Sequence, residues 1–199
     1  GFDHFMLKEI YEEPKTVRDT LRGHILQDGR IDLPDVKFST EQWNKIRRIT
    51  IVGCGTAYHA GLVGKRLLEK LLRRPVDSAV ASEFRYSDPL VDDETLVILI
   101  SQSGETADTL AAMNLAKLKG ALTLGVVNVV GSTLSRDADA VLYTQAGPEI
   151  GVASTKAYLA QLVALTLLAV YLSQDNGLSL AERNEIVAAL QKLPEQIEE

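Results

Sequence analysis

The sequence is short of cysteine, of basic residues and of any leader that would export it. Cys54 is the only cysteine among 199 residues, so no disulfide can form within the chain, and a cytoplasmic location fits best. Lys and Arg number 21 against 27 Asp and Glu, and the net charge of −6 argues against nucleic acid as a partner. The chain opens at Gly1 without the basic n-region or the cleavage site of a signal peptide.

Metal-ligand patterns are missing as well. His4, His24 and His59 are the only histidines, and none has metal-ligand spacing with Cys54 or with a pair of carboxylates. We therefore expect neither a metal site nor a cofactor. His59 is expected to be a solvated helix residue, with the wall of a pocket as the alternative.

What is present describes a globular domain. Hydrophobic residues make up 46% and charged residues 24%, which is ordinary for one folded domain of this length. The chain begins without Met and stops within a helical pattern, so we expect a piece of a longer protein. Residues 1–40 are predicted to form an N-terminal helical and linker extension, and residues 41–199 the domain with its C-terminal helix.

Short β-branched runs alternate with longer segments of helical period, which indicates βαβ units and a parallel sheet. We predict a three-layer α/β/α sandwich with five parallel strands, of flavodoxin-like type. The predicted strands are residues 49–53, 76–80, 96–100, 122–127 and 140–143, and the predicted helices are 41–48, 57–72, 107–119, 133–137 and 181–193.

The segment Val152–Ser173 is long, apolar and free of charge from Ala157 onward, so by composition it could cross a membrane. Polar residues, Lys156 and Gln161 among them, interrupt it, and no basic flank follows. We therefore expect a helix buried in the protein or against a partner domain or subunit, and no membrane partner.

Three loops share small and hydroxyl-bearing residues: the first loop (residues 53–58), the second loop (101–106) and the third loop (147–155). The second loop carries Ser101, Ser103 and Thr106 after a buried strand and before a helix. Hydroxyls beside a helix N-terminus can hold a phosphate group without a lysine. The alternative is a capped helix with no ligand, because serine and threonine are favoured caps.

The first loop contains Gly53 and Gly55, but Tyr58 stands where a dinucleotide-binding fingerprint needs its third glycine. Cys54 follows a buried strand, where a thiol is usually inert rather than a nucleophile. Lys156 opens the long helix, and we expect it to face solvent or to support the helix end rather than to form a Schiff base.

Five blocks of the sequence together resemble a known family. They are residues 4–14, 53–58, 81–86, 101–109 and 149–156. The block that begins Ser101-Gln102-Ser103-Gly104-Glu105-Thr106 is similar to the phosphosugar signature of sugar isomerase (SIS) domains. All five, in this order, resemble the glucosamine-6-phosphate synthase family, and specifically its first SIS domain.

The resemblance implies a phosphosugar site built from all three loops. The implied substrate-binding residues are Thr56, Ala57, Ser101, Gln102, Ser103, Thr106, Val152 and Ser154, with Cys54, Gly55, Gly104 and Glu149 as pocket wall. Ala57 departs from the pattern, because many relatives carry serine there, so one side-chain contact is missing and only a backbone contact would remain.

The resemblance also implies an activity for the longer protein. That family makes glucosamine 6-phosphate and glutamate from fructose 6-phosphate and glutamine, with a glutaminase domain, two SIS domains and a homodimer. Its catalytic lysine, glutamate and histidine match no position here, so we expect this chain to bind phosphosugar without turnover. The alternatives are a free-standing SIS phosphosugar sensor, another SIS sugar-phosphate isomerase, or a Rossmann-type oxidoreductase that binds NAD.

Overall fold

A single parallel sheet organises the protein. The computed structural model describes residues 2–199, and its five strands run in the order β2-β1-β3-β4-β5. Every pairing between neighbouring strands is parallel, which confirms the predicted sheet. The strands are β1 Arg48–Gly53, β2 Val76–Val80, β3 Thr95–Ser101, β4 Leu122–Val127 and β5 Ala140–Tyr143.

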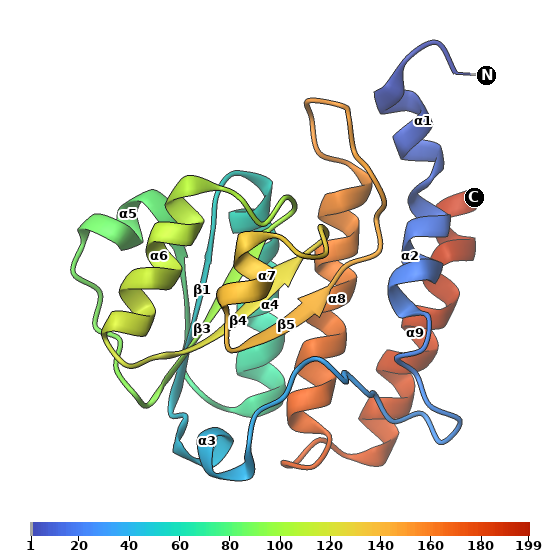
Figure 1. Cartoon of the computed structure of the whole chain (residues 1–199). Helices are drawn as coiled ribbons and strands as arrows, with labels where there is room; N and C mark the ends of the chain where they lie inside the picture. The colour runs from blue at the N-terminus through green and yellow to red at the C-terminus, as the bar shows by residue number, and fades with distance from the viewer. Residues whose placement is uncertain (1) are drawn as a thin grey trace.

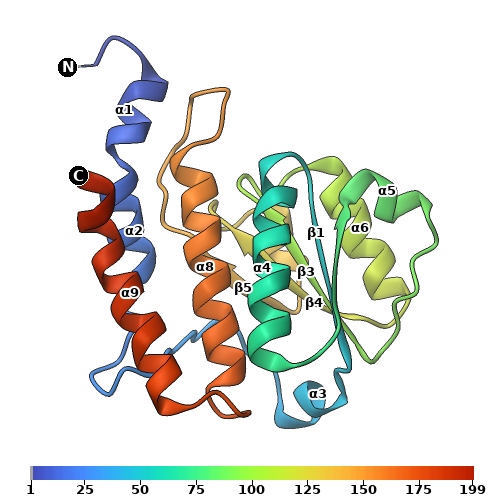
Figure 2. The same ribbon diagram turned by 180° about the vertical axis from the view of Figure 1, so that it is seen from behind.

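Helices cover both faces of this sheet, as Figures 1 and 2 show from opposite sides. α4 and α8 lie on one face, and α5, α6 and α7 on the other. Over residues 2–199 the helices are α1 Phe5–Tyr11, α2 Glu13–Leu21, α3 Thr40–Lys45, α4 Thr56–Leu72, α5 Ala81–Tyr86, α6 Ala107–Leu118, α7 Thr133–Asp137, α8 Lys156–Ser173 and α9 Leu180–Glu198.

The central strand β3 shows why two helical layers are needed. All seven of its residues are buried, because alternate side chains enter opposite hydrophobic clusters. Ile98 belongs to the cluster shared with α4 and α8, and Leu99 to the cluster shared with α5 and α6. A strand that is apolar on both faces cannot be left at the surface.

The N-terminal segment packs beside the C-terminal helix. α2 lies against α8 and α9, and its Val17 and Leu21 enter the same hydrophobic cluster as α8. Arg18 on α2 forms an ion pair with Glu198 on α9 at 2.7 Å. Residues of the predicted extension therefore help to complete the core of the domain (Figure 2).

α8 satisfies the length and composition of a membrane span, but 72% of that helix is buried inside the protein. It packs beside α4 and α2, as a core helix does. The helix expected to begin at Val152 begins at Lys156 instead, because residues 152–155 belong to the third loop.

Other elements also differ from the sequence prediction, among them α9, which continues to Glu198 instead of ending at residue 193. The short helix expected over residues 41–48 ends at Lys45, because Arg48 already pairs with Thr95 as the first residue of β1. α5 is not predicted from the sequence. It follows β2 directly, with no turn residue between the strand and the helix.

We predict that shortening a buried leucine of β3 lowers the free energy of unfolding far more than shortening an exposed one. Leu99→Ala, at a position with no exposed surface, should cost about 2–5 kcal/mol. Leu118→Ala, at a side chain 86% exposed on α6, is the matched control and should stay within about 0.5 kcal/mol. Urea unfolding curves compare the two, and equal losses would contradict the assigned core.

Candidate functional site

The first and second loops leave the same edge of the sheet. β1 and β3 are neighbours, and Gly53 at the end of β1 lies opposite Ile100 of β3. α4 begins at Thr56 within the first loop, and α6 begins at Ala107 directly after the second loop. Both helix N-termini therefore lie at the carboxyl edge, where ligands bind in open α/β sheets (Figure 1).

The hydroxyl groups of the second loop bond first to the loop itself. Ser101 Oγ lies 2.9 Å from Thr106 Oγ1 and accepts the backbone N–H of Gly104 at 3.0 Å. Ser103 Oγ accepts the backbone N–H of Glu105 at 3.2 Å. Ser101 is buried, whereas Ser103 and Thr106 are half-buried.

Only glycine fits this loop conformation at position 104. Its φ is +68°, and a Cβ there would lie 2.1 Å from Ser132 Oγ and 2.7 Å from Val127 Cγ2. The left-handed backbone and the close approach both require glycine.

Neighbouring segments hold the second loop in place. The carbonyl of Gln102 accepts the N–H of Asn128 at 3.1 Å, and the carbonyl of Gly104 accepts that of Leu134 at 3.0 Å. The carboxylate of Glu105 accepts the N–H of Thr133 at 2.8 Å. That hydrogen bond from the α7 backbone holds the pKa of the Glu105 carboxyl below its ordinary value.

The start of α6 has no side-chain cap. Thr106 occupies the N-cap position, but its hydroxyl contacts Ser101 rather than the first turn. The N–H of Leu110 makes a hydrogen bond to the carbonyl of Thr106, so the N–H groups before Leu110 have no partner within the helix. These donors, together with the helix dipole, suit a bound anion.

The first loop lies next to the second. Cys54 Sγ is 3.9 Å from Thr109 Oγ1 on α6, and the thiol is half-buried. Gly55, with φ of +55°, is the N-cap of α4, and the Thr56 side chain that follows it is exposed. Ala57 is buried and donates its N–H to the carbonyl of Cys54 at 3.1 Å.

The third loop reaches the same edge ahead of α8. α4 and α8 lie side by side and begin at the same end (Figures 1 and 2). Glu149 accepts the N–H groups of Thr155 at 3.1 Å and Ala157 at 3.0 Å, and this cap explains why α8 starts late. Val152 is fully exposed and Ser154 half-buried between these anchors.

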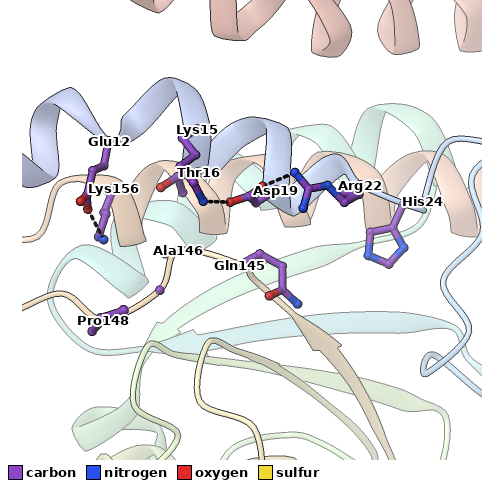
Figure 3. Close-up of a pocket in the computed structure, with 11 residues that line it drawn as sticks. Glu12, Lys15, Thr16, Asp19, Arg22, His24, Gln145, Ala146, Pro148 and Lys156 are labelled. Atoms are coloured by element: carbon purple, nitrogen blue, oxygen red, sulfur yellow. Dashed lines mark hydrogen bonds and ion pairs between the residues drawn. The ribbon is translucent and has the colours of Figure 1, made fainter.

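Lys156 does not face solvent. Its side chain is 4% exposed, and its Nζ lies 2.6 Å from Glu12 Oε2 on the N-terminal segment (Figure 3). This hydrogen-bonded ion pair holds the pKa of the Glu12 carboxyl below its ordinary value. The expectation that Lys156 faces solvent is therefore wrong, and the ion pair joins the start of α8 to the N-terminal segment.

A cleft of ≈520 Å³ lies between α2 and the residues that follow β5, apart from the first and second loops. Its charged groups pair with one another: Asp19 bonds to Lys15 and, at 2.7 Å, to Arg22 (Figure 3). Each of its three cations, Lys15, Arg22 and Lys156, pairs with one of its two carboxylates, Asp19 or Glu12. Its lining residues are Glu12, Lys15, Thr16, Asp19, Arg22, His24, Gln145, Ala146, Gly147, Pro148 and Lys156.

Within residues 2–199, no group of three or more His, Cys, Asp or Glu side chains could hold a metal ion. His59 is exposed, and its Nδ1 lies 3.0 Å from the carbonyl oxygen of Gly55.

Comparison with known proteins gives consistent matches. The model of the SIS domain family matches residues 43–171. A glutamine–fructose-6-phosphate aminotransferase (isomerizing) from Clostridium tetani is 56% identical over the whole chain, and one from Thermus thermophilus is 50% identical. The chain spans about a third of the length of each of these relatives, 33% in both cases.

Solved structures agree. The C-terminal domain of glucosamine-fructose-6-phosphate aminotransferase from Francisella tularensis superposes with a TM-score of 0.90 at 41% identity, over 98% of this chain and 55% of that one. A putative phosphosugar isomerase from Silicibacter pomeroyi superposes with a TM-score of 0.76 at 28% identity, over 97% and 55%.

We predict that Gly104→Ala lowers the free energy of unfolding more than Gly131→Ala. Both positions have a positive φ, so either alanine should cost about 1–2 kcal/mol of backbone strain. Gly131 faces open space, whereas the new methyl at Gly104 meets Ser132 and should add about 1–3 kcal/mol. Urea unfolding measures both, and equal costs would refute the close approach.

We predict that Lys156→Gln raises the pKa of the Glu12 carboxyl, because the buried ammonium partner is lost. Lys8→Gln is the control, since the Lys8 ammonium is 53% exposed at 3.4 Å and should matter less. A lowered folded-state pKa means that the pair stabilises the fold above the ordinary pKa and loses this effect as the pH falls through the lowered value. NMR titration of the Glu12 carboxyl carbon measures this pKa in each variant. An unchanged pKa in Lys156→Gln would contradict the ion pair between Lys156 and Glu12.

Proposed function

The chain belongs to the SIS domain family, and on that premise we propose that the second loop binds the phosphate of fructose 6-phosphate. One observation carries the proposal: the uncapped start of α6 lies beside the hydroxyls of Ser103 and Thr106 at the carboxyl edge of the sheet. Ser101 and Gln102 complete the phosphate-binding loop, with Ser101 acting from inside it.

The sugar is proposed to lie between the first and third loops. Thr56 and the backbone of Ala57 contact it from the start of α4, and Val152 and Ser154 from the segment before α8. The exposure of Thr56 and Val152 supports this placement, because both are accessible to a ligand. The proposed wall consists of Cys54, Gly55, Gly104 and Glu149.

The activity proposed for the longer protein follows the relatives. Those relatives are glutamine–fructose-6-phosphate aminotransferases (isomerizing), and this chain corresponds to about a third of their length. In such a protein this domain would hold fructose 6-phosphate while a glutaminase domain and a second SIS domain supply ammonia and the catalytic groups. We place the protein in the cytoplasm as a homodimer that makes glucosamine 6-phosphate and glutamate.

We predict that Ser103→Ala and Thr106→Ala each weaken fructose 6-phosphate binding. Losing a hydrogen bond to a charged group costs about 1.5–3 kcal/mol, which corresponds to about ten- to a hundredfold in affinity. Ser87→Ala, just beyond α5, is the control and should bind as the parent protein does. Calorimetry or NMR titration of this chain gives the affinities.

Unchanged affinity in both loop variants would exclude the second loop as the phosphate site. The same preparation, given glutamine and fructose 6-phosphate, should form no glucosamine 6-phosphate. Formation of that product would show that this chain holds the catalytic groups itself.

A further inference from the structure

The third loop is held by a carboxylate from the N-terminal helix. Glu9 of α1 accepts the N–H of Ile150 at 2.6 Å, and the N–H of Gly151 lies 3.2 and 3.1 Å from its two oxygens. The residue is only 3% exposed. A buried carboxylate is costly unless it is hydrogen-bonded, and here two successive peptide groups supply the donors.

Glu9 is also the only residue of α1 that is buried among those the structure describes. The apolar residues of the helix stay 39–69% exposed: Phe5, Met6, Leu7, Ile10 and Tyr11. α1 therefore meets the third loop through one acidic side chain rather than through an apolar face. A contact made by apolar burial has no fixed direction, whereas hydrogen bonds from Ile150 and Gly151 to Glu9 fix the position of these two peptide groups.

The rest of the third loop is anchored as well. Glu149 binds the first N–H groups of α8, and Lys156 pairs with Glu12. With Glu9 at residues 150–151 and these contacts at residues 155–157, only residues 152–154 span the gap between fixed points. Those are the residues that the proposed function places against the sugar.

We propose that Glu9 is a positioning residue for the sugar-contacting part of the third loop. This inference rests on the proposed function of that loop. Glu9 does not touch the sugar; it fixes the peptide groups of Ile150 and Gly151, which sets where Val152 and Ser154 lie. The N-terminal helix is then a part of the phosphosugar site rather than a tether leading to it.

Gly151 provides a second way to test the contact. A Cβ on Gly151 would lie 2.6 Å from Glu9 Oε2 and 3.5 Å from the Cα of Met6. Gly151→Ala therefore displaces the carboxylate from the side of the loop and leaves the sequence of α1 intact.

The first measurement is amide hydrogen exchange at Ile150 and Gly151 in the 199-residue chain. Glu9→Ala removes both acceptors and should speed exchange at these two amides by about tenfold or more, and Glu9→Gln should give a smaller effect. Glu185→Gln, an exposed glutamate on α9, is the matched control and should leave them unchanged. Protection of the β3 amides reports that each variant is folded.

The second measurement compares two ligands by NMR titration. Glu9→Ala and Gly151→Ala should each weaken fructose 6-phosphate by about tenfold and leave the affinity for inorganic phosphate unchanged. A purely structural role would weaken both ligands together. The ratio of the two affinities therefore separates positioning of the sugar loop from loss of the fold.

Three outcomes overturn the proposal: unchanged exchange at both amides, an unchanged affinity ratio in both variants, or loss of β3 protection in every variant, which would make Glu9 structural. If the parent chain binds inorganic phosphate but not fructose 6-phosphate, the proposed function fails instead. The exchange result would then still decide whether Glu9 holds the loop.

Discussion

Burial of β3 on both faces is the constraint on which the rest of the molecule depends. Parallel pairing requires each connection between strands to cross a face of the sheet. Because neither face of β3 can meet water, helices in these connections cover both faces. Each such helix then starts at the carboxyl edge with its free N–H groups. The candidate site follows from this cover. α4 and α6 start at the carboxyl edge because each leads back to the opposite edge for the next strand, and α8, which follows β5, starts at the same edge (Figure 1).

Local pattern was enough to predict the sheet and the loops that leave it. The strands at residues 76–80, 122–127 and 140–143 have the bounds expected from the sequence. α5 was not predicted, since it follows β2 with neither glycine nor proline between them. The start of α8 was placed too early, because apolar composition cannot show that a carboxylate from Glu149 caps the helix at residue 155.

The contacts that hold the third loop could not be predicted from the sequence for a different reason, which is the distance along the chain between the partners. Lys156 and Glu12 are 144 residues apart in sequence, and Ile150 and Glu9 are 141 apart. A lysine in the first turn of a helix and a glutamate on an exposed helix are both ordinary surface residues by local pattern. Only the path of the chain, which brings the N-terminal segment back against α8, turns them into buried partners.

That path also dictates an order of events during synthesis. α2 precedes the sheet in the sequence, yet Val17 and Leu21 find their apolar partners on α8 and α9, which follow the sheet. Until α8 and α9 have been made, α2 lacks these partners, and α4 covers that face of the sheet without α8 beside it. Native contacts this distant in sequence are slow to form. During synthesis, α2 therefore stays without these apolar partners until at least residue 173, the end of α8, has been made.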